Sequence, residues 1–444
     1  MSLIAPPPNI KKVFEDLKSI SRVLLVGENP QLRELLYKAN DQYMYWSDIL
    51  HRVPKGLNFK AEEIWAYLKI VRSANSKSTP LSDKDNRSFT FWTPDGLHKS
   101  ISEVDKWSGG RIITHQPHAL PSKEKYIISC LMDEAIASSQ LEGASTEHQV
   151  AKEMLRSGRK PKDKHEQMIF NNWKAMQYIR QNIKNELTLD RLIELHILLT
   201  QNTLDDPNDC GRLRETDDIE VRYKDEVVHI PPKAHTLKDR LVNLFKFANT
   251  DEEATWIHPV IKGAMIHFWL AYDHPFVDGN GRTARALMYW YLLNRDYDLF
   301  QYLSISKHFL RAPGQYARAY LYTEHDDNDL TYFLIYNLDS IRVALQELVN
   351  YLQTKQHELS EVNRLLQKFK GLNFRQKSLV YHSIQYPETV YSIDTHKNTY
   401  GLAYETARKD ITALVSKGFL KPQRQGKRRL LFYATGKSIE KIKQ

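Results

Sequence analysis

One short stretch of the chain gathers side chains suited to phosphate chemistry. In HPFVDGNGRTAR, residues 274–285, a histidine, a carboxylate, two glycines flanking an asparagine and two arginines follow one another closely. Gly279 and Gly281 allow the backbone to turn its N–H groups toward an anion. The residues that follow have few breakers and helical apolar spacing, so a helix should begin here with an anion site at its N-terminus. The stretch therefore predicts a site for a nucleoside triphosphate.

The remaining side chains of this stretch fit the same chemistry. Arg282 and Arg285 lie one helical turn apart, so both can face one phosphate tail. Asp278 offers a hard oxygen ligand to a Mg²⁺ ion that bridges phosphates. His274, held by the proline after it, is placed to act as a general base. A plain glycine turn before a core helix would explain the turn but not this clustering.

These residues resemble the Fic motif, His-x-Phe-x-(Asp/Glu)-Gly-Asn-Gly-(Arg/Lys)-x-x-Arg, and every fixed position is filled. The resemblance implies a mainly α, Fic-type helical core with a β-hairpin flap. The implied reaction transfers AMP from ATP to a Ser, Thr or Tyr hydroxyl of a target protein, with ATP as substrate and Mg²⁺ as cofactor. The implied roles are general base for His274, metal ligand for Asp278, anion hole for Gly279, Asn280 and Gly281, and β- and γ-phosphate binding for Arg282 and Arg285.

A second pattern lies upstream, where 123–142 is free of breakers and has an apolar face typical of an amphipathic helix. It ends at Gly143, which suits a helix C-cap. Ser138, Glu142 and Gly143 resemble the inhibitory motif of the Fic family, Ser/Thr-x-x-x-Glu-(Gly/Asn). The resemblance implies that Glu142 pairs with Arg285 and keeps the ATP phosphates out of line for attack. Taken alone, the pattern would be a helix end with a solvated glutamate.

Between these motifs the chain changes period. Apolar residues alternate at 219–223 and 228–230 around a Lys-Asp-Glu turn, which predicts a hairpin. The resemblance to the Fic family implies that this hairpin is a flap that aligns the main chain of the target by pairing with it as an added strand. Ile230 and Pro231 are the residues expected to make that contact. Two other histidines receive modest roles. His196 is expected to be packed or at the surface, and His267 is expected either to pack or to make a hydrogen bond that supports the motif loop.

Length, charge and cysteine content limit which kinds of protein this chain can be. The 444 residues suffice for two to four domains, and a net charge of +9 allows an anionic partner without naming one. Apolar runs long enough for a membrane span and the apolar core of a secretory signal are absent from the sequence. Two cysteines, Cys130 and Cys210, lack metal-type spacing and favour a reducing, cytoplasmic location. A homodimer is compatible with this composition.

The predicted organisation has four parts. They are an N-terminal helical region at 1–120, a catalytic core at 121–310 with the inhibitory helix at 123–143, a helical connector at 311–372 and a C-terminal module at 373–437. Within the first part, 75–86 is predicted to be a loop and 89–93 a short strand before a turn at 94–96.

The C-terminal module shows three helical segments and then a basic hairpin, with a turn predicted at 422–426 and a strand at 429–433. This order is typical of a winged helix-turn-helix, which binds either DNA or protein. On this reading Thr406, Arg408 and Lys409 lie on the third helix, and Lys427 and Arg428 lie on the wing. Together they predict DNA as a partner.

Two other functions remain open from the sequence. The same residues serve the reverse reaction, removal of AMP from a modified protein, with Glu142 orienting a water. A DNA-binding regulator whose Fic core only senses nucleotide would instead bind DNA without needing His274. Self-modification is a further option, with Thr146 as a candidate acceptor.

Overall fold

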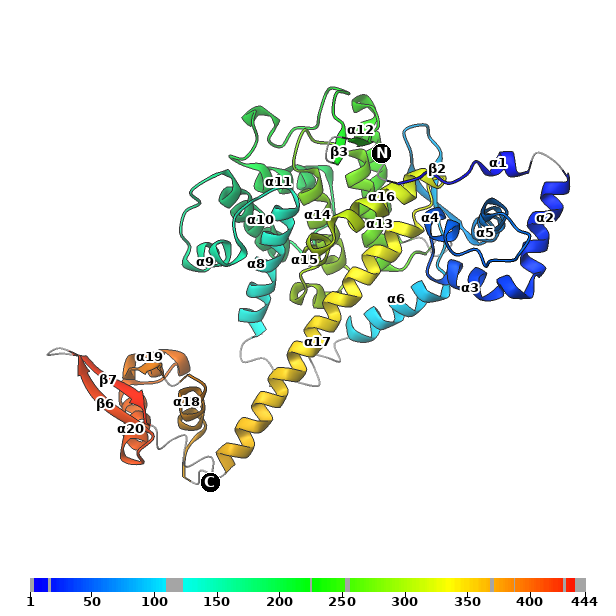
Figure 1. Cartoon of the computed structure of the whole chain (residues 1–444). Coiled ribbons are helices and arrows are strands. Elements are labelled where there is room, and N and C mark those ends of the chain that lie inside the picture. The colour runs from blue at the N-terminus through cyan, green and yellow to red at the C-terminus, as the bar shows by residue number, and fades with distance from the viewer. Residues whose placement is uncertain are drawn as a thin grey trace. The chain divides into compact units, whose positions relative to one another are not determined.

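The computed structural model describes residues 4–14, 17–108, 123–223, 226–251, 256–367, 371–386, 388–425 and 429–435. Most of them are helical, and the chain divides into two compact units, Met1–Val349 and Asn350–Gln444 (Figure 1). Among these residues, every helix is too short or too polar to cross a membrane.

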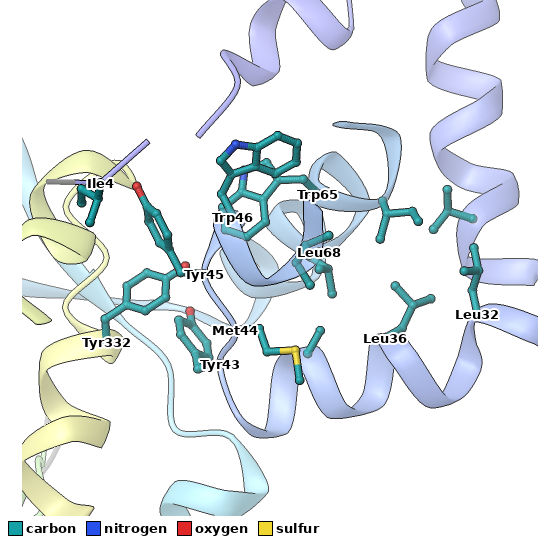
Figure 2. Close-up of a cluster of buried hydrophobic side chains, with 14 of the residues drawn as sticks. Ile4, Leu32, Leu36, Tyr43, Met44, Tyr45, Trp46, Trp65, Leu68 and Tyr332 are labelled. Carbon is teal, nitrogen blue, oxygen red and sulfur yellow. The ribbon is translucent and has the colours of Figure 1, made fainter. Parts of the chain in front are cut away.

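The N-terminal part of the first unit packs aromatic side chains into a cluster of its own. Its elements are α1 (Ile10–Val13), α2 (Leu17–Glu28), η1 (Pro30–Leu32), α3 (Arg33–Asp41), α4 (Trp46–Leu50), α5 (Ala61–Asn75), β1 (Lys77–Ser82), β2 (Ser88–Phe91) and α6 (Asp95–Ser108). Figure 2 shows Tyr43, Tyr45 and Tyr332 next to one another, with Trp46 and Trp65 beside them. Because Tyr332 belongs to a helix far along the chain, this cluster joins the N-terminal part to the rest of the unit.

A buried polar network strengthens the same junction. Arg72 of α5 is 1% exposed and donates to the carbonyls of Ala39 and Met44 and to the Tyr332 hydroxyl. Lys69, one turn earlier, pairs with buried Asp326 at 2.8 Å. Buried charges are stable only when paired or hydrogen-bonded, so these contacts fix α5 against the turn that precedes α17 (Thr331–Gln367).

The loop predicted at 75–86 was wrong for residues 77–82, whereas residues 83–86 lie in the turn between two strands. Instead of a loop, β1 pairs antiparallel with β2, Lys77 facing Phe91. Only Thr79 and Leu81 of β1 are buried, and the strand is otherwise Ser, Lys and Pro, so its alternation was hidden by loop-type residues. The predicted turn at 94–96 contains the start of α6, whereas the predicted strand at 89–93 is confirmed by β2.

The rest of the first unit surrounds two helices that are buried almost entirely. Its elements are α8 (Lys123–Leu141), α9 (His148–Ser157), α10 (Lys164–Gln181), α11 (Leu189–Thr200), η2 (Pro207–Asp209), β3 (Val221–Tyr223), β4 (Glu226–His229), η3 (Ala234–Thr236), α12 (Leu237–Asn249), α13 (Pro259–Asp273), α14 (Asn280–Asn294), η5 (Asp298–Tyr302), α15 (Ser306–Arg311), α16 (Pro313–His325) and α17. The central pair is α13 and α14, which pack on each other and are flanked by α8, α10, α11 and α12 (Figure 1). Almost every residue of both helices is buried, which places the pair at the centre of the core.

Helix α8 and the flap hairpin appear where the sequence predicted them. Glu134 fixes α8 because its buried carboxylate accepts from the Tyr289 hydroxyl at 3.1 Å and from the Ser306 amide at 2.9 Å. Strands β3 and β4 pair antiparallel, with Val221 opposite His229. The predicted turn residues Lys224 and Asp225 lie outside the described residues.

The second unit has its own small core. It contains α18 (Phe374–Gln385), β5 (Val390–Tyr391), α19 (Ile393–Tyr400), α20 (Tyr404–Ser416), β6 (Leu420–Gln425) and β7 (Arg429–Ala434), with antiparallel strand order β5-β7-β6. The turn predicted at 422–426 was wrong for 422–425, because Pro422 through Gln425 continue β6 opposite β7. Lys427 and Arg428 lie outside the described residues.

Candidate active site

The motif loop begins where α13 stops. His274 is the C-cap of α13 and adopts the left-handed conformation, with φ 46° and ψ 57°. Gly279, at φ 85°, is the N-cap of α14. Between them the side chain of Asn280 closes the loop, since its Oδ1 accepts from the Phe276 amide at 2.9 Å and its Nδ2 donates to the Phe276 carbonyl at 2.8 Å. The asparagine side chain thus shapes the loop, and only its backbone N–H is left to face an anion.

His274 is arranged as a neutral base. Its Nδ1 lies 3.2 Å from the Ala271 carbonyl, an acceptor, so Nδ1 carries the proton and Nε2 keeps its lone pair. Burial is the largest cause that lowers the pKa of His274, to about 4, and the positive charges of His229 and Arg214 act in the same direction. The imidazole is therefore unprotonated at neutral pH and able to accept a proton.

The start of α14 has the features of an anion site. Gly279 has no side chain to cap the helix, which leaves the N–H groups of the first turn directed outward with the positive end of the helix dipole. Arg282 is 1% exposed, and one of its terminal nitrogens donates to the Leu199 carbonyl at 2.9 Å. Its buried Nε has no hydrogen-bond partner among the described residues. A buried cation with an unused donor beside a helix N-terminus suits a phosphate oxygen.

Arg285 is held by the end of α8. Its Nε donates to Ser138 Oγ and its Nη2 to the Ser138 carbonyl, each at 2.9 Å. The same Nη2 pairs with Glu142 Oε1 at 2.9 Å, the contact that the motif resemblance implied. Burial is the largest single effect and opposes charge on Arg285, but the Glu142 carboxylate and Tyr316 together more than offset it, so the pKa of Arg285 is raised. Burial likewise opposes charge on Glu142, yet Arg285, Arg282 and His274 lower its pKa overall.

Backbone geometry explains how Glu142 reaches this position. The Gly143 amide donates to the Gln140 carbonyl and the Ala144 amide to the Ser139 carbonyl, with Gly143 at φ 90°. This pair of bonds is the Schellman motif, and it ends α8 so that Glu142 projects from the helix terminus. A Cβ on Gly281 would lie 2.2 Å from Glu142 Oε1, so the carboxylate occupies the space against the α14 backbone.

Asp278 is the one carboxylate on the motif loop. Its side chain is 57% exposed, its Oδ1 accepts from the Gly279 amide at 2.5 Å, and its Oδ2 lies 3.8 Å from Arg282. In the described part of the chain, groups of three or more His, Cys, Asp or Glu that could hold a metal are absent. A Mg²⁺ ion here would thus take one protein ligand and draw its other oxygens from phosphates and water, which is how Mg²⁺ commonly binds beside nucleotides.

His196 of α11 supports the loop, a role that the sequence prediction missed. Its ring stacks on Phe276 with centroids 3.7 Å apart, and its Nε2 donates to the Asp278 carbonyl at 2.9 Å. Burial lowers the pKa of His196 to about 4, so the neutral ring accepts from the Gly211 amide at Nδ1. One histidine on an apolar helix carries no signal of such a contact in the sequence.

Of the two roles predicted for His267, the structure shows packing and not a hydrogen bond to the motif loop. His267 is fully buried in α13 but contacts the Tyr316 hydroxyl at 2.8 Å and Asn337 Oδ1 at 3.3 Å, on α16 and α17. These partners belong to α16 and α17, and neither of them lies on the motif loop. His267 joins helices and does not touch the chemistry.

The two residues predicted for target docking lie at the end of the flap with opposite exposure. Ile230 is 51% exposed, whereas Pro231 is buried. In the second unit, Thr406, Arg408 and Lys409 are all exposed on α20, and Arg408 lies 3.4 Å from Glu405.

Comparison with known proteins agrees with this geometry. Residues 186–292 match the model of the Fic/DOC family. Curated relatives named Protein adenylyltransferase Fic include one from Drosophila virilis, 25% identical over 302 residues, which covers 66% of this chain and 60% of the relative. Another, from Nematostella vectensis, is 31% identical over 148 residues and covers 30% and 33% of the two chains. The chain thus spans less than two thirds of either relative.

A solved structure shares the fold. The crystal structure of a Fic family protein from Desulfovibrio desulfuricans G20 superposes with a TM-score of 0.54 at 18% identity, covering 76% of this chain and 95% of that one. The filled motif and the match over 186–292 thus make this part of the chain similar to the Fic/DOC family, and the solved structure shows that the fold is shared.

Proposed function

We propose that this protein transfers AMP from ATP to a hydroxyl side chain of a target protein and is restrained by Glu142. The observation that carries the proposal is the 2.9 Å pair between Glu142 and Arg285, set against the N-terminus of α14 and near His274. The names of the curated relatives support the same reaction.

Each residue of the candidate site has a separate role in the proposed reaction. His274 Nε2 accepts the proton of the target hydroxyl, whose oxygen forms a bond to the α-phosphorus of ATP as the bond to pyrophosphate breaks. The α14 N-terminus and Arg282 stabilise the charge that develops on the phosphate oxygens. Asp278 would hold a Mg²⁺ ion, which neutralises phosphate charge when bound. Arg285, once free of Glu142, would bind the terminal phosphate.

A labelling experiment tests this proposal. The full chain, Glu142→Gly, and Glu142→Gly with His274→Ala are each incubated with Mg²⁺, a cell lysate and ATP labelled either at the α- or at the γ-phosphate. We expect protein labelling from α-label only, strong in Glu142→Gly and lost with His274→Ala. Absence of α-label in all variants would contradict the proposal and favour the reverse reaction, which is then tested by release of AMP from a modified protein.

We also propose that the second unit contacts DNA through α20. The exposed Thr406, Arg408 and Lys409 support this proposal, because basic and hydroxyl side chains on an exposed helix suit phosphate and base contacts. Gel-shift titration against random-sequence duplex should show weaker binding for Arg408→Ala with Lys409→Ala, and unchanged binding for His274→Ala. Equal affinity of the double variant would remove the proposal.

The free thiols Cys130 and Cys210 support a cytoplasmic location, which we propose as well.

A further inference from the structure

The C-terminal end of α13 is unusual in how its last carbonyls are satisfied. A helix leaves its final carbonyls without intrahelical donors, and buried ones need partners from elsewhere. The Leu270 carbonyl accepts from the His274 amide, and the Ala271 carbonyl lies beside His274 Nδ1. The next three carbonyls, those of Tyr272, Asp273 and His274, accept from side chains that lie outside the helix.

Arg214 supplies two of these donors. This arginine is 4% exposed and lies on the segment that leads into β3. Its Nε donates to the His274 carbonyl at 2.8 Å, and its Nη2 approaches the Asp273 carbonyl at 3.4 Å. The same Nη2 donates to the carbonyl of Pro232, just beyond the flap, while Nη1 donates to the Thr216 carbonyl at 2.9 Å. One guanidinium thus bonds both the catalytic loop and the exit of the flap.

His229, the last residue of β4, supplies the remaining donor. Its Nε2 lies 2.7 Å from the Tyr272 carbonyl and its Nδ1 lies 2.8 Å from Glu324 Oε2 of α16. Both partners are acceptors, so only the doubly protonated imidazolium makes both bonds at once. The carboxylates facing this ring are Glu324 and, more distantly, the buried Asp273, which pairs with Arg240.

We propose that Arg214 and His229 are positioning residues that cap α13 from the flap, so that flap placement and the orientation of His274 are set together. Cations at a helix C-terminus are favourable because they face the negative end of the dipole. His274 needs this support, since its left-handed conformation (φ 46°) is uncommon for a residue other than glycine, asparagine or aspartate. In this arrangement a target strand that pairs with the flap is held in register with the base.

This inference rests on the proposed function only where it calls His274 the base. The two side chains make separable contributions. The positive charges of Arg214 and His229 both lower the pKa of His274. The variant Arg214→Lys keeps the charge but loses the paired N–H donors of the guanidinium. His229→Gln retains one amide donor and loses the charge. Arg342 of α17, 49% exposed and 3.4 Å from Asp339 on the same helix, offers a matched control because it lies outside the flap and the motif loop.

The first test is kinetic and uses the full chain with Glu142→Gly as background. His229→Gln should lower kcat for the protein target about tenfold, as expected for loss of a charge-assisted bond, with little change in KM for ATP. Its acid limb in the pH–rate profile should move to higher pH, because removal of a nearby cation makes His274 easier to protonate. Arg214→Lys should lower kcat without moving the limb, and Arg342→Gln should change neither. Unchanged kcat and an unmoved limb in His229→Gln would overturn the proposal.

The second test does not depend on activity. In protein labelled at histidine, the NMR titration of the His274 ring is assigned by its loss in His274→Ala. Its midpoint should rise in His229→Gln and stay constant in Arg342→Gln. An unmoved midpoint in folded His229→Gln would refute the capping role even if AMP transfer occurs. A raised midpoint without any transfer activity would support the capping role and reject the proposed function.

Discussion

Replacing Glu142 by glutamine should increase kcat/KM for ATP about 30-fold, and the size follows from the burial of the pair. Arg285 is 2% exposed and Glu142 is 31% exposed, at 2.9 Å. Exposed ion pairs contribute about 0–1 kcal/mol, whereas breaking a buried pair costs about 3–5 kcal/mol. A half-buried pair lies between, near 2 kcal/mol, and about 1.4 kcal/mol corresponds to a tenfold change. This is the free energy that ATP must supply to displace the carboxylate from Arg285.

The assay measures initial rates of protein labelling from α-labelled ATP over a range of ATP concentrations. Glu147→Gln is the matched control, since it removes the same charge five residues further on, at an exposed position. The reasoning fails if Glu142→Gln behaves like wild type and like Glu147→Gln. An increase seen only in Glu142→Gly would also refute the electrostatic account, because it would assign inhibition to the bulk of the side chain against Gly281.

Three further predictions follow from contacts described above. The acid limb of AMP transfer should lie near pH 4, not near 6.5, because the pKa of His274 is lowered to about 4 and the base is lost only below it; a limb at pH 6 or above in the pH–rate profile would contradict this. Gly281→Ala should lower the Tm of the wild type more than it lowers the Tm of the Glu142→Gly variant, since the added Cβ lies 2.2 Å from Glu142 Oε1. Equal losses of Tm in both backgrounds would exclude the clash. Arg72→Met should lower the free energy of unfolding by about 3 kcal/mol, because buried carbonyls and the Tyr332 hydroxyl lose their donor; an unchanged urea midpoint would show that they find other partners.

The sequence was most informative where the residues of the candidate site follow one another in the chain. The end of α13, the motif loop and the start of α14 follow one another in the chain, so glycine positions and helical spacing located them together. Helix α8 was also predictable, because its amphipathic run ends in a glycine that the backbone uses at φ 90°. The alternation around the flap likewise gave β3 and β4.

The residues that support the motif loop from other segments could not be predicted in the same way. His196 and Arg214 reach the motif loop from segments about 60 to 80 residues upstream, and each is a single polar residue without a local pattern. Their function depends on which carbonyls remain unpaired in the folded chain, and that depends on tertiary packing. Strand β1 was missed for a related reason, since its two buried side chains are separated by proline.

The Schellman turn at the end of α8 has a kinetic meaning. Two backbone bonds, from the Gly143 and Ala144 amides, hold Glu142, the residue that we propose restrains the site. Helix ends open with far less free energy than a whole domain, while Glu134 keeps the body of α8 in place. If opening costs the same 2 kcal/mol as the ion pair, about 3% of molecules have an uncovered Arg285 at any moment. On the proposed function, AMP transfer would thus never stop completely, and its background rate would report how often one helical turn opens.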